Sequence, residues 1–261
     1  MRFSANLGFL WTDRPLPDAI RAAGAAGFDA VELHWPYDVP AADVAAALRE
    51  TGLPCLGLNT RRGDVAGGEN GLAALSGREA EARAAIDEAL AYGAEIGAGM
   101  VHVMAGFAEG PEAHATFIAN LAYACDRAVL RGMGILIEPL NRYDARGYFL
   151  RTTGQATAIM DEVGHDALRL MFDCYHVQLM EGDLTHRLRD LLPRIGHIQF
   201  ASVPDRGAPD HGEVDFNYLF RVIERLGYDR PLGAEYKPGG DTDATLAWLR
   251  AYRESGAGPA A

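Results

Sequence analysis

GILIEP (residues 134–139) is the first of four apolar segments that each carry an oxygen-bearing side chain at or near the end. The others are LRLMFD (168–173), HIQFA (197–201) and PLGAEY (231–236). The four side chains are Glu138, Asp173, Gln199 and Glu235. Carboxylate and amide oxygens are unfavourable in an apolar core, but they are the ligands that hard divalent cations prefer. Four such residues on four predicted strands therefore indicate a metal site at the strand ends.

The rest of the chain repeats the same alternation of a short apolar run and a helical stretch. Strands are predicted at 3–7, 28–34, 53–59, 100–104, 133–138, 168–173, 196–201 and 231–236. Helices are clearest at 41–50, 78–97 and 111–131, and Gly52, Gly132 and Gly227 stand where helices should end. Eight such units with continuously apolar strands are typical of parallel strands buried on both faces. We predict a single (β/α)8 barrel over residues 1–261, with an open doubly wound sheet as the alternative.

The ends of the predicted strands share a second property. In such a barrel the chemistry is located at the C-terminal mouth, where the strands end. Every predicted strand carries a polar side chain there: Asn6, Glu32 with His34, Asn59, His102, Glu138, Asp173, Gln199 and Glu235. One polar strand end could be a helix cap or a loop contact. Eight at the same level indicate a pocket.

Two of these residues, Glu138 and Glu235, are the candidate catalytic pair. They belong to the fifth and eighth strands, which lie across the mouth from each other. Two carboxylates that face one another over a small substrate can move a proton between adjacent carbons, one removing it and the other returning one. Asp173 and Gln199 would complete the ligand set of a divalent cation. The alternative is a buried cluster of ion pairs at the barrel rim, which is costly without a cation.

Other polar residues are candidates for substrate contacts. His176 follows Asp173 by three residues and could be a ligand, a substrate contact or a helix-start residue. Asn59 ends the third predicted strand and His102 ends the fourth. His102 could contact a substrate hydroxyl or could be a structural packing residue. His197 shares a strand face with Gln199 and is either a buried barrel histidine or a substrate contact.

The loop VPDRGAPDHGEVDF (203–216) follows the seventh strand and adds further candidates. Arg206 could bind a substrate carboxylate with two hydrogen bonds. Glu213 could hold a substrate oxygen or orient Arg206, or it could lie in the first turn of the next helix. Lys237 is a second possible anion contact, although a solvated lysine is the more common arrangement.

The overall composition of the chain limits the classes of partner that it is expected to bind. The chain has 24 basic and 36 acidic residues, a net charge of −12, and no dense basic patch beyond Arg61–Arg62, so nucleic-acid binding is not expected. Three scattered cysteines form no disulfide framework or zinc finger, and Cys174 is interpreted as a packing residue. No signal peptide or apolar run of membrane-spanning length is present. A soluble, cytoplasmic protein is expected.

Separated motifs in this chain resemble the hydroxypyruvate isomerase family, a branch of the xylose isomerase-like barrels. They are RFSANL (2–7), WPYD (35–38), GDVAGGENGLAALSGRE (63–79), IEPLN (137–141), YHVQLMEGDL (175–184), IGHIQFA (195–201), PDRGAPDHGE (204–213) and GAEYKP (233–238). The resemblance implies that Glu138 and Glu235 are the acid/base pair and that Asp173 and Gln199 join them as metal ligands. Related sugar epimerases carry histidine at the third ligand position. Gln199 should favour Mg²⁺ or Mn²⁺ over zinc.

Two loops depart from the family pattern. The loop after the third strand usually reads NLPAGDW, but here it is NTRRGDV (59–65), which replaces an aromatic residue and adds Arg61 and Arg62 near the mouth. The loop after the seventh strand carries Asp205 and His211 where other residues are common. Both changes bear on the substrate and leave the acid/base residues intact.

The resulting hypothesis is an aldose–ketose isomerase that converts hydroxypyruvate to 2-hydroxy-3-oxopropanoate (tartronate semialdehyde) through an enediolate. A related isomerase or epimerase of a four- to six-carbon sugar or 2-oxo acid, such as a 2-oxo-tetronate isomerase, is the nearest alternative. A dehydratase or lyase on the same barrel is more distant, and a multi-zinc DNA-repair endonuclease lacks the histidines and charge it would need. The family implies a homo-oligomer, and Trp11, Trp35 and Tyr37 could line either the pocket or a subunit contact.

Overall fold

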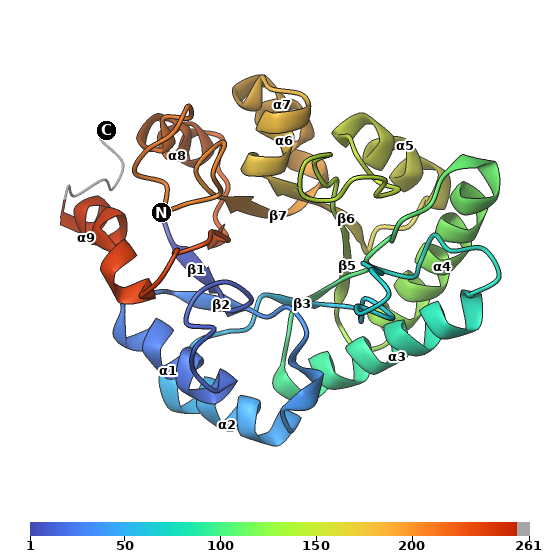
Figure 1. Cartoon of the computed structure of the whole chain (residues 1–261), viewed down its shortest axis with the longest axis horizontal. Helices are drawn as coiled ribbons and strands as arrows, with labels where there is room; N and C mark the ends of the chain where they lie inside the picture. Colours follow the sequence, from blue (N-terminus) through green and yellow to red (C-terminus); the bar gives the residue numbers. More distant parts are fainter. Residues whose placement is uncertain (255–261) are drawn as a thin grey trace.

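The computed structural model describes residues 1–254, in which eight parallel strands form a ring surrounded by helices (Figure 1). The strands are β1 Phe3–Asn6, β2 Ala30–Glu32, β3 Gly57–Asn59, β4 Met100–His102, β5 Gly134–Ile137, β6 Leu168–Asp173, β7 Ile195–Phe200 and β8 Leu232–Ala234. Each strand overlaps the range predicted for it. Residues 255–261 of the predicted domain lie outside the described residues.

The ring is closed. Neighbouring strands pair in the order β2-β1-β8-β7-β6-β5-β4-β3. The two ends of this order meet where the Val31 N–H donates to the Pro54 carbonyl at 3.0 Å and the Val31 carbonyl accepts from the Leu56 N–H at 2.9 Å. A further bond joins the Leu33 N–H to the Gly57 carbonyl at 2.9 Å. The predicted (β/α)8 barrel is therefore confirmed over the described residues, and the open sheet was the wrong alternative.

The helices alternate with the strands along the chain. They are α1 Leu16–Ala25, α2 Ala41–Thr51, α3 Glu79–Ile96, α4 Gly110–Val129, α5 Thr153–Val163, α6 Cys174–Met180, α7 Leu184–Leu191, α8 Phe216–Arg225 and α9 Ala247–Glu254, with short 3-10 turns η1 Pro36–Asp38, η2 Leu192–Arg194 and η3 Thr242–Thr245. Gly52, Gly132 and Gly227 follow α2, α4 and α8 with φ angles of +70°, +67° and +82°. Such left-handed residues end helices because glycine adopts them without steric cost.

The interior of the barrel is less filled than the usual packed core of branched side chains. Glycines occur on several strands where a side chain would project inward: a Cβ at Gly196 would lie 2.8 Å from Leu136 Cδ2, and one at Gly134 would lie 2.7 Å from Met100 Cε. These glycines make room for the side chains of Leu136 and Met100, and a cavity of about 620 Å³ lies in the interior. Its lining runs from the mouth to the opposite end of the barrel and includes Asn6, His102, Gln199, Arg169 and Arg230. The open interior leaves room for polar side chains beneath the mouth.

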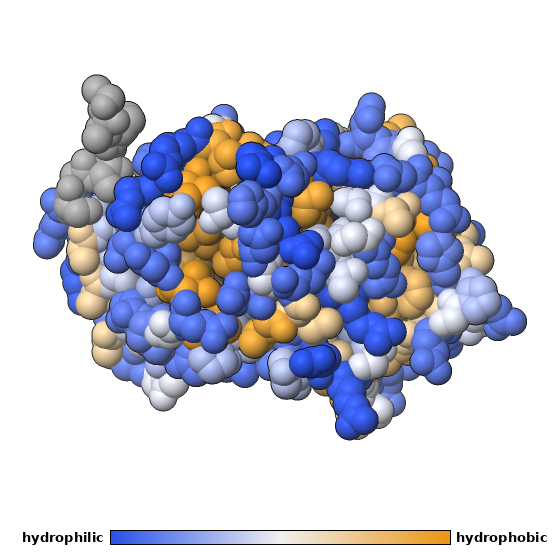
Figure 2. Space-filling view, turned by 90° about the horizontal axis from the view of Figure 1, so that it is seen from above, coloured by the Kyte–Doolittle hydropathy of each residue, from blue (hydrophilic) through white to orange (hydrophobic). Residues whose placement is uncertain are grey.

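The apolar core lies between the ring and its helices. Phe3 on β1 packs edge-to-face against Phe200 and Trp248, with ring centroids 5.9 and 5.2 Å apart. Figure 2 shows mostly hydrophilic residues on one outer face, with hydrophobic residues visible between them. No helix within residues 1–254 is long and apolar enough to cross a membrane.

Candidate active site

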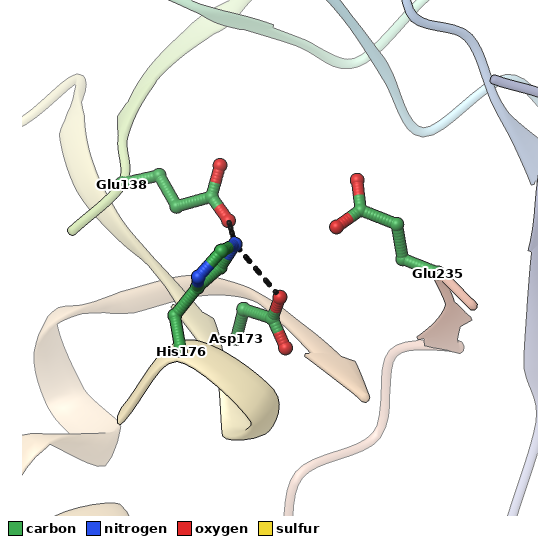
Figure 3. Close-up of side chains that lie close together, drawn as sticks. All are labelled: Glu138, Asp173, His176 and Glu235. Carbon is green, nitrogen blue, oxygen red and sulfur yellow. Dashed lines mark ion pairs between the residues drawn. The ribbon is translucent and has the colours of Figure 1, made fainter. Parts of the chain in front are cut away.

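Three carboxylates from three strands meet at the C-terminal mouth. Glu138 directly follows β5, Asp173 ends β6 and Glu235 directly follows β8. Each of them, together with His176 from α6, offers one atom that lies within 4.8 Å of the others, and all four side chains are buried. Figure 3 shows Glu138 and Glu235 on opposite sides of this space with their carboxylates turned toward it. The structure thus brings together the pair that the strand pattern placed across the mouth.

Three buried oxygens at this site have no hydrogen-bond partner among residues 1–254. They are Glu138 Oε1, Asp173 Oδ2 and Gln199 Oε1. Gln199 pairs in register with Asp173 across β6 and β7, so the two side chains share one level of the barrel. Because an unpaired buried polar atom costs free energy, three of them on three predicted ligands fit a divalent cation with oxygen ligands.

Glu235 is the most strongly hydrogen-bonded member of the cluster. Its Oε1 accepts from Asn6 Nδ2 at 3.0 Å and contacts His34 Nε2 at 3.0 Å, and its Oε2 accepts from Arg206 Nη2 at 2.6 Å. Burial alone would raise the pKa of Glu235, but the Arg206 charge and the His34 hydrogen bond lower it to about 2. Glu235 is therefore ionised at neutral pH.

The pKa of Glu138 is shifted in the opposite direction to that of Glu235. Burial, followed by repulsion from Glu235 and Asp173, raises the pKa of Glu138 well above its ordinary value. Burial and repulsion from Glu235 likewise raise the pKa of Asp173 to about 7. Without a cation, Glu138 therefore holds its proton more tightly than Glu235 does. Two carboxyl groups whose pKa values are pushed apart by their surroundings are suited to separate acid and base roles.

His176 faces these carboxylates without a hydrogen bond to either of them. Its Nδ1 accepts from the Asn141 backbone N–H at 3.1 Å. Burial lowers the pKa of His176 to about 3, so the ring is neutral and its single proton is on Nε2. That atom lies 3.8 Å from Glu138 Oε1 and 3.5 Å from Asp173 Oδ2 (Figure 3). Several roles were left open for His176. A ring with its proton on Nε2 favours the role of hydrogen-bond donor to a substrate or a carboxylate over the role of metal ligand.

His102 on β4 faces the carboxylate cluster, whereas Asn59 on β3 lines the interior cavity. Burial lowers the pKa of His102 to about 3, and its Nδ1 lies 3.6 Å from Glu138 Oε2. Neither ring nitrogen of His102 has a hydrogen-bond partner within the described residues, which leaves this side chain available to a substrate hydroxyl. Asn59 is half-buried and lines the interior cavity together with His102.

Arg206 brings a positive charge to the carboxylate cluster. Its side chain is buried, and its guanidinium lies between the rings of Phe9 and Tyr175, 4.7 and 5.0 Å from their centroids. Besides its bond to Glu235, Arg206 donates from Nη1 to Asp144 Oδ2 at 3.3 Å. Its φ of +59° is uncommon for a residue with a side chain and is typical of strained backbone at functional sites.

Two predicted substrate contacts lie outside the buried cluster. Glu213 is exposed, and its Oε1 accepts from Gln178 Nε2 at 3.2 Å. The Lys237 side chain is also exposed, but its backbone N–H donates to the Arg206 carbonyl at 2.7 Å and so helps to place that residue. Arg61 is directed to the surface, where its guanidinium makes two hydrogen bonds to Glu88.

The structure gives a role at the site to residues for which the sequence suggested none. His34 reaches Glu235 because Gly8 leaves room: a Cβ at position 8 would lie 2.0 Å from His34 Nδ1. Asn141 fixes the ring of His176, and Asp144 holds Arg206. A polar residue at the end of the second strand was the available signal for His34. Asn141 and Asp144 lie in a loop, where periodicity gives no signal.

Comparison with known proteins identifies the family of this chain. The chain matches the xylose isomerase-like TIM barrel family over residues 20–252. It is 45% identical over 255 residues to the 2-oxo-tetronate isomerase of Cupriavidus necator, covering 96% of this chain and 98% of that protein. It is 42% identical over 263 residues to a "Putative hydroxypyruvate isomerase" of Mus musculus, with coverages of 97% and 95%.

A solved structure is similar over almost the whole chain. It is the crystal structure of "AP endonuclease, family 2" from Brucella melitensis, with a TM-score of 0.93 and 39% sequence identity. The match covers 96% of this chain and 98% of that one. The chain therefore belongs to the hydroxypyruvate isomerase family of xylose isomerase-like TIM barrels and is an aldose–ketose isomerase.

Proposed function

We propose that the protein interconverts hydroxypyruvate and 2-hydroxy-3-oxopropanoate by proton transfer between C3 and C2. The observation that carries this proposal is the pair of buried carboxylates Glu138 and Glu235, which face one space from opposite sides and whose pKa values are shifted in opposite directions. Arg206, beside Glu235, supplies the cation that a 2-oxo acid requires. The names of the relatives support an isomerase of this kind.

In the proposed reaction the substrate carboxylate binds Arg206 and Glu235 removes a proton from C3. Glu138 delivers a proton to C2, while the hydroxyl proton moves from O3 to O2, so that no atom is gained or lost. A divalent cation, which we propose to be Mg²⁺ or Mn²⁺, would be held by Glu138, Asp173, Gln199 and Glu235 and would polarise the substrate carbonyl.

The contact between Arg206 and Glu235 also explains how a weakly basic carboxylate becomes an effective base. A group with a pKa near 2 removes a carbon-bound proton poorly, because general-base catalysis is best when the pKa lies near the working pH. A bound substrate carboxylate competes for the Arg206 guanidinium. As the arginine shifts toward the substrate, Glu235 loses its main positive partner and its basicity rises. Substrate binding would thus activate the base.

A four-carbon 2-oxo acid is a second candidate substrate, supported by the 45% identity to a 2-oxo-tetronate isomerase. Both acids share the hydroxyl, carbonyl and carboxylate groups that the site would hold, and they differ beyond C3. Arg62 stacks on Trp35 with its guanidinium carbon 3.8 Å from the ring centroid, and Trp35 in turn lies against His34. No ion pair to Arg62 is found within residues 1–254, so it is the candidate contact for a C4 hydroxyl.

Replacement of Arg62 by alanine is expected to separate the two substrates. If Arg62 binds a C4 hydroxyl, the loss of this hydrogen bond to a charged group costs about 1.5 kcal/mol, or roughly tenfold in kcat/KM for 2-oxo-tetronate. The kcat/KM for hydroxypyruvate should change by less than about twofold. The matched control is Arg61→Ala, which removes a surface ion pair with Glu88. Equal losses for both substrates would argue against a role in reading substrate length.

The raised pKa values predict an unusual pH dependence of stability in chelated protein. The folded state holds protons on Asp173 up to a pKa of about 7, compared with 3.8 ordinarily, and Glu138 shifts in the same direction. Since the folded state then binds more protons than the unfolded state, the free energy of unfolding falls as the pH rises through this range. Glu235 acts oppositely, and its contribution is lost only as the pH falls from 4.5 toward about 2.

Thermal unfolding checks this expectation. In the presence of chelator, the melting temperature should be lower at about pH 7.5 than at about pH 5. Addition of Mn²⁺ at the higher pH should raise it, because a ligand that binds only the folded state stabilises that state. A melting temperature that rises with pH in chelator would contradict the assigned pKa shifts.

A further inference from the structure

We propose that Glu32, buried below the carboxylate cluster, is a positioning residue that turns the Gln199 carboxamide so that its oxygen faces the proposed cation site. This inference rests on the proposed cation site and concerns a residue outside the predicted ligand set. It assigns a role to the polar interior of the barrel.

Hydrogen bonds fix the orientation of the Gln199 amide. Gln199 Nε2 donates to Glu32 Oε2 at 2.7 Å and lies 3.4 Å from Glu235 Oε1. Ionised carboxylates only accept hydrogen bonds, so the amide nitrogen must be the atom directed toward them. Gln199 Oε1 then points elsewhere, and it is one of the three buried oxygens without a partner. An amide in the reverse orientation would place an N–H₂ group, which cannot bind a cation, at that position.

Glu32 is itself held rigidly. It ends β2 and is only 4% exposed. Ser4 Oγ donates to Glu32 Oε1 at 2.5 Å, and His197 Nε2 lies 3.0 Å from Glu32 Oε2. Of the two roles left open for His197, this contact supports a buried barrel histidine. The carboxylate is thus hydrogen-bonded to Ser4 on β1 and lies close to His197 on β7 before it meets Gln199.

The backbone is also adapted to this contact. A Cβ at Gly233 on β8 would lie 2.3 Å from Glu32 Oε1 and 2.7 Å from Gln199 Cγ. Any larger residue at position 233 would push the two side chains apart. A buried carboxylate without a lysine or arginine partner is expensive to maintain. The cost is understandable if the carboxylate orients a cation ligand, because partners that orient ligands typically change metal affinity by about 10- to 100-fold.

Binding of Mn²⁺ to chelator-treated, dialysed protein tests the proposal without reference to activity. We expect Glu32→Gln to weaken Mn²⁺ binding by about 10- to 100-fold, measured by calorimetry or by the electron paramagnetic resonance signal of free Mn²⁺. A carboxamide at position 32 can donate to Gln199 Oε1 and so stabilise the reversed amide. Ser4→Ala is the matched control. It removes a donor to Glu32 without touching Gln199, and less than about a threefold change is expected.

A second variant separates orientation from a merely structural role. Gln199→Glu presents an oxygen in either orientation, so orientation no longer matters there. The double variant Glu32→Gln with Gln199→Glu should therefore bind Mn²⁺ at least tenfold more tightly than Glu32→Gln alone. The proposal is overturned if Glu32→Gln binds like the parent, or if the double variant shows no such recovery. If the parent binds no Mn²⁺, the cation site and this inference both fail, whereas binding by the parent with an unaffected Glu32→Gln refutes the inference alone.

Discussion

Glu138→Gln and Glu235→Gln are each expected to lower kcat for hydroxypyruvate by about 10³-fold or more, because each removes one partner of the proton transfer. Both substitutions keep the size and polarity of the side chain, so the fold should be retained. Loss of a buried carboxylate from a mutually repelling cluster should also leave chelated Glu138→Gln at least as stable as the parent, because Glu138 is repelled by both Glu235 and Asp173. Steady-state kinetics and thermal unfolding measure these two quantities.

The two variants should differ in solvent exchange, because the opposite pKa shifts of Glu138 and Glu235 assign the two residues different steps. If Glu235 is the base at C3, Glu138→Gln should still exchange the C3 hydrogens of hydroxypyruvate for deuterium while forming little product. Glu235→Gln should lose both exchange and product. The control is Arg61→Ala, because Arg61 lies at the surface and outside the carboxylate pair. Asn141→Asp would be unsuitable as a control, because Asn141 orients His176. Near-parental turnover in both glutamine variants would refute the assigned acid/base pair.

Arg206→Lys is expected to reduce kcat/KM for hydroxypyruvate by roughly 100-fold, corresponding to the loss of about 2–3 kcal/mol of charge-assisted hydrogen bonding. Lysine keeps the charge but cannot grip a carboxylate with two parallel bonds, and it does not stack between Phe9 and Tyr175 as the guanidinium does. Because lysine holds the substrate carboxylate less well, we expect KM for hydroxypyruvate to increase.

A substrate without a carboxylate provides the matched comparison. Dihydroxyacetone retains the hydroxyl and the carbonyl of hydroxypyruvate, so parent protein should convert it slowly, and Arg206→Lys should change that slow rate by less than about threefold. A loss of equal size for both compounds would show that Arg206 acts only through the architecture of the site. In that case the carboxylate would have to bind elsewhere.

The fold could be predicted because it depends on patterns that are local in the sequence. The helix predicted at 78–97 is α3, Glu79–Ile96, and the one predicted at 41–50 is α2, Ala41–Thr51. Strand lengths were predicted less well. The segment 53–59 yields only β3, Gly57–Asn59, because Cys55 makes an isolated bridge to Val31 instead of joining a continuous strand pair.

The residues at strand ends were located for the same reason, since the register of parallel strands brings their ends to one level. For the loop residues, the sequence named the candidates but could not tell which of them would reach the cluster. Arg206 and Glu213 lie in one polar loop, yet Arg206 is buried against Glu235 whereas Glu213 is exposed. No periodicity encodes the direction of a loop side chain. The pKa shift of Glu138 and the contacts of His176 depend on distances between strands and therefore required the structure.

The central claim is that hydroxypyruvate is isomerised through an enediolate by Glu138 and Glu235. Proton NMR of hydroxypyruvate in D₂O with purified protein tests it most directly, first with Mg²⁺ or Mn²⁺ and then with chelator. The account predicts 2-hydroxy-3-oxopropanoate carrying solvent deuterium at C2, with the rate falling when the cation is removed. The absence of both product and C3 exchange in folded protein, with either cation present, would contradict it.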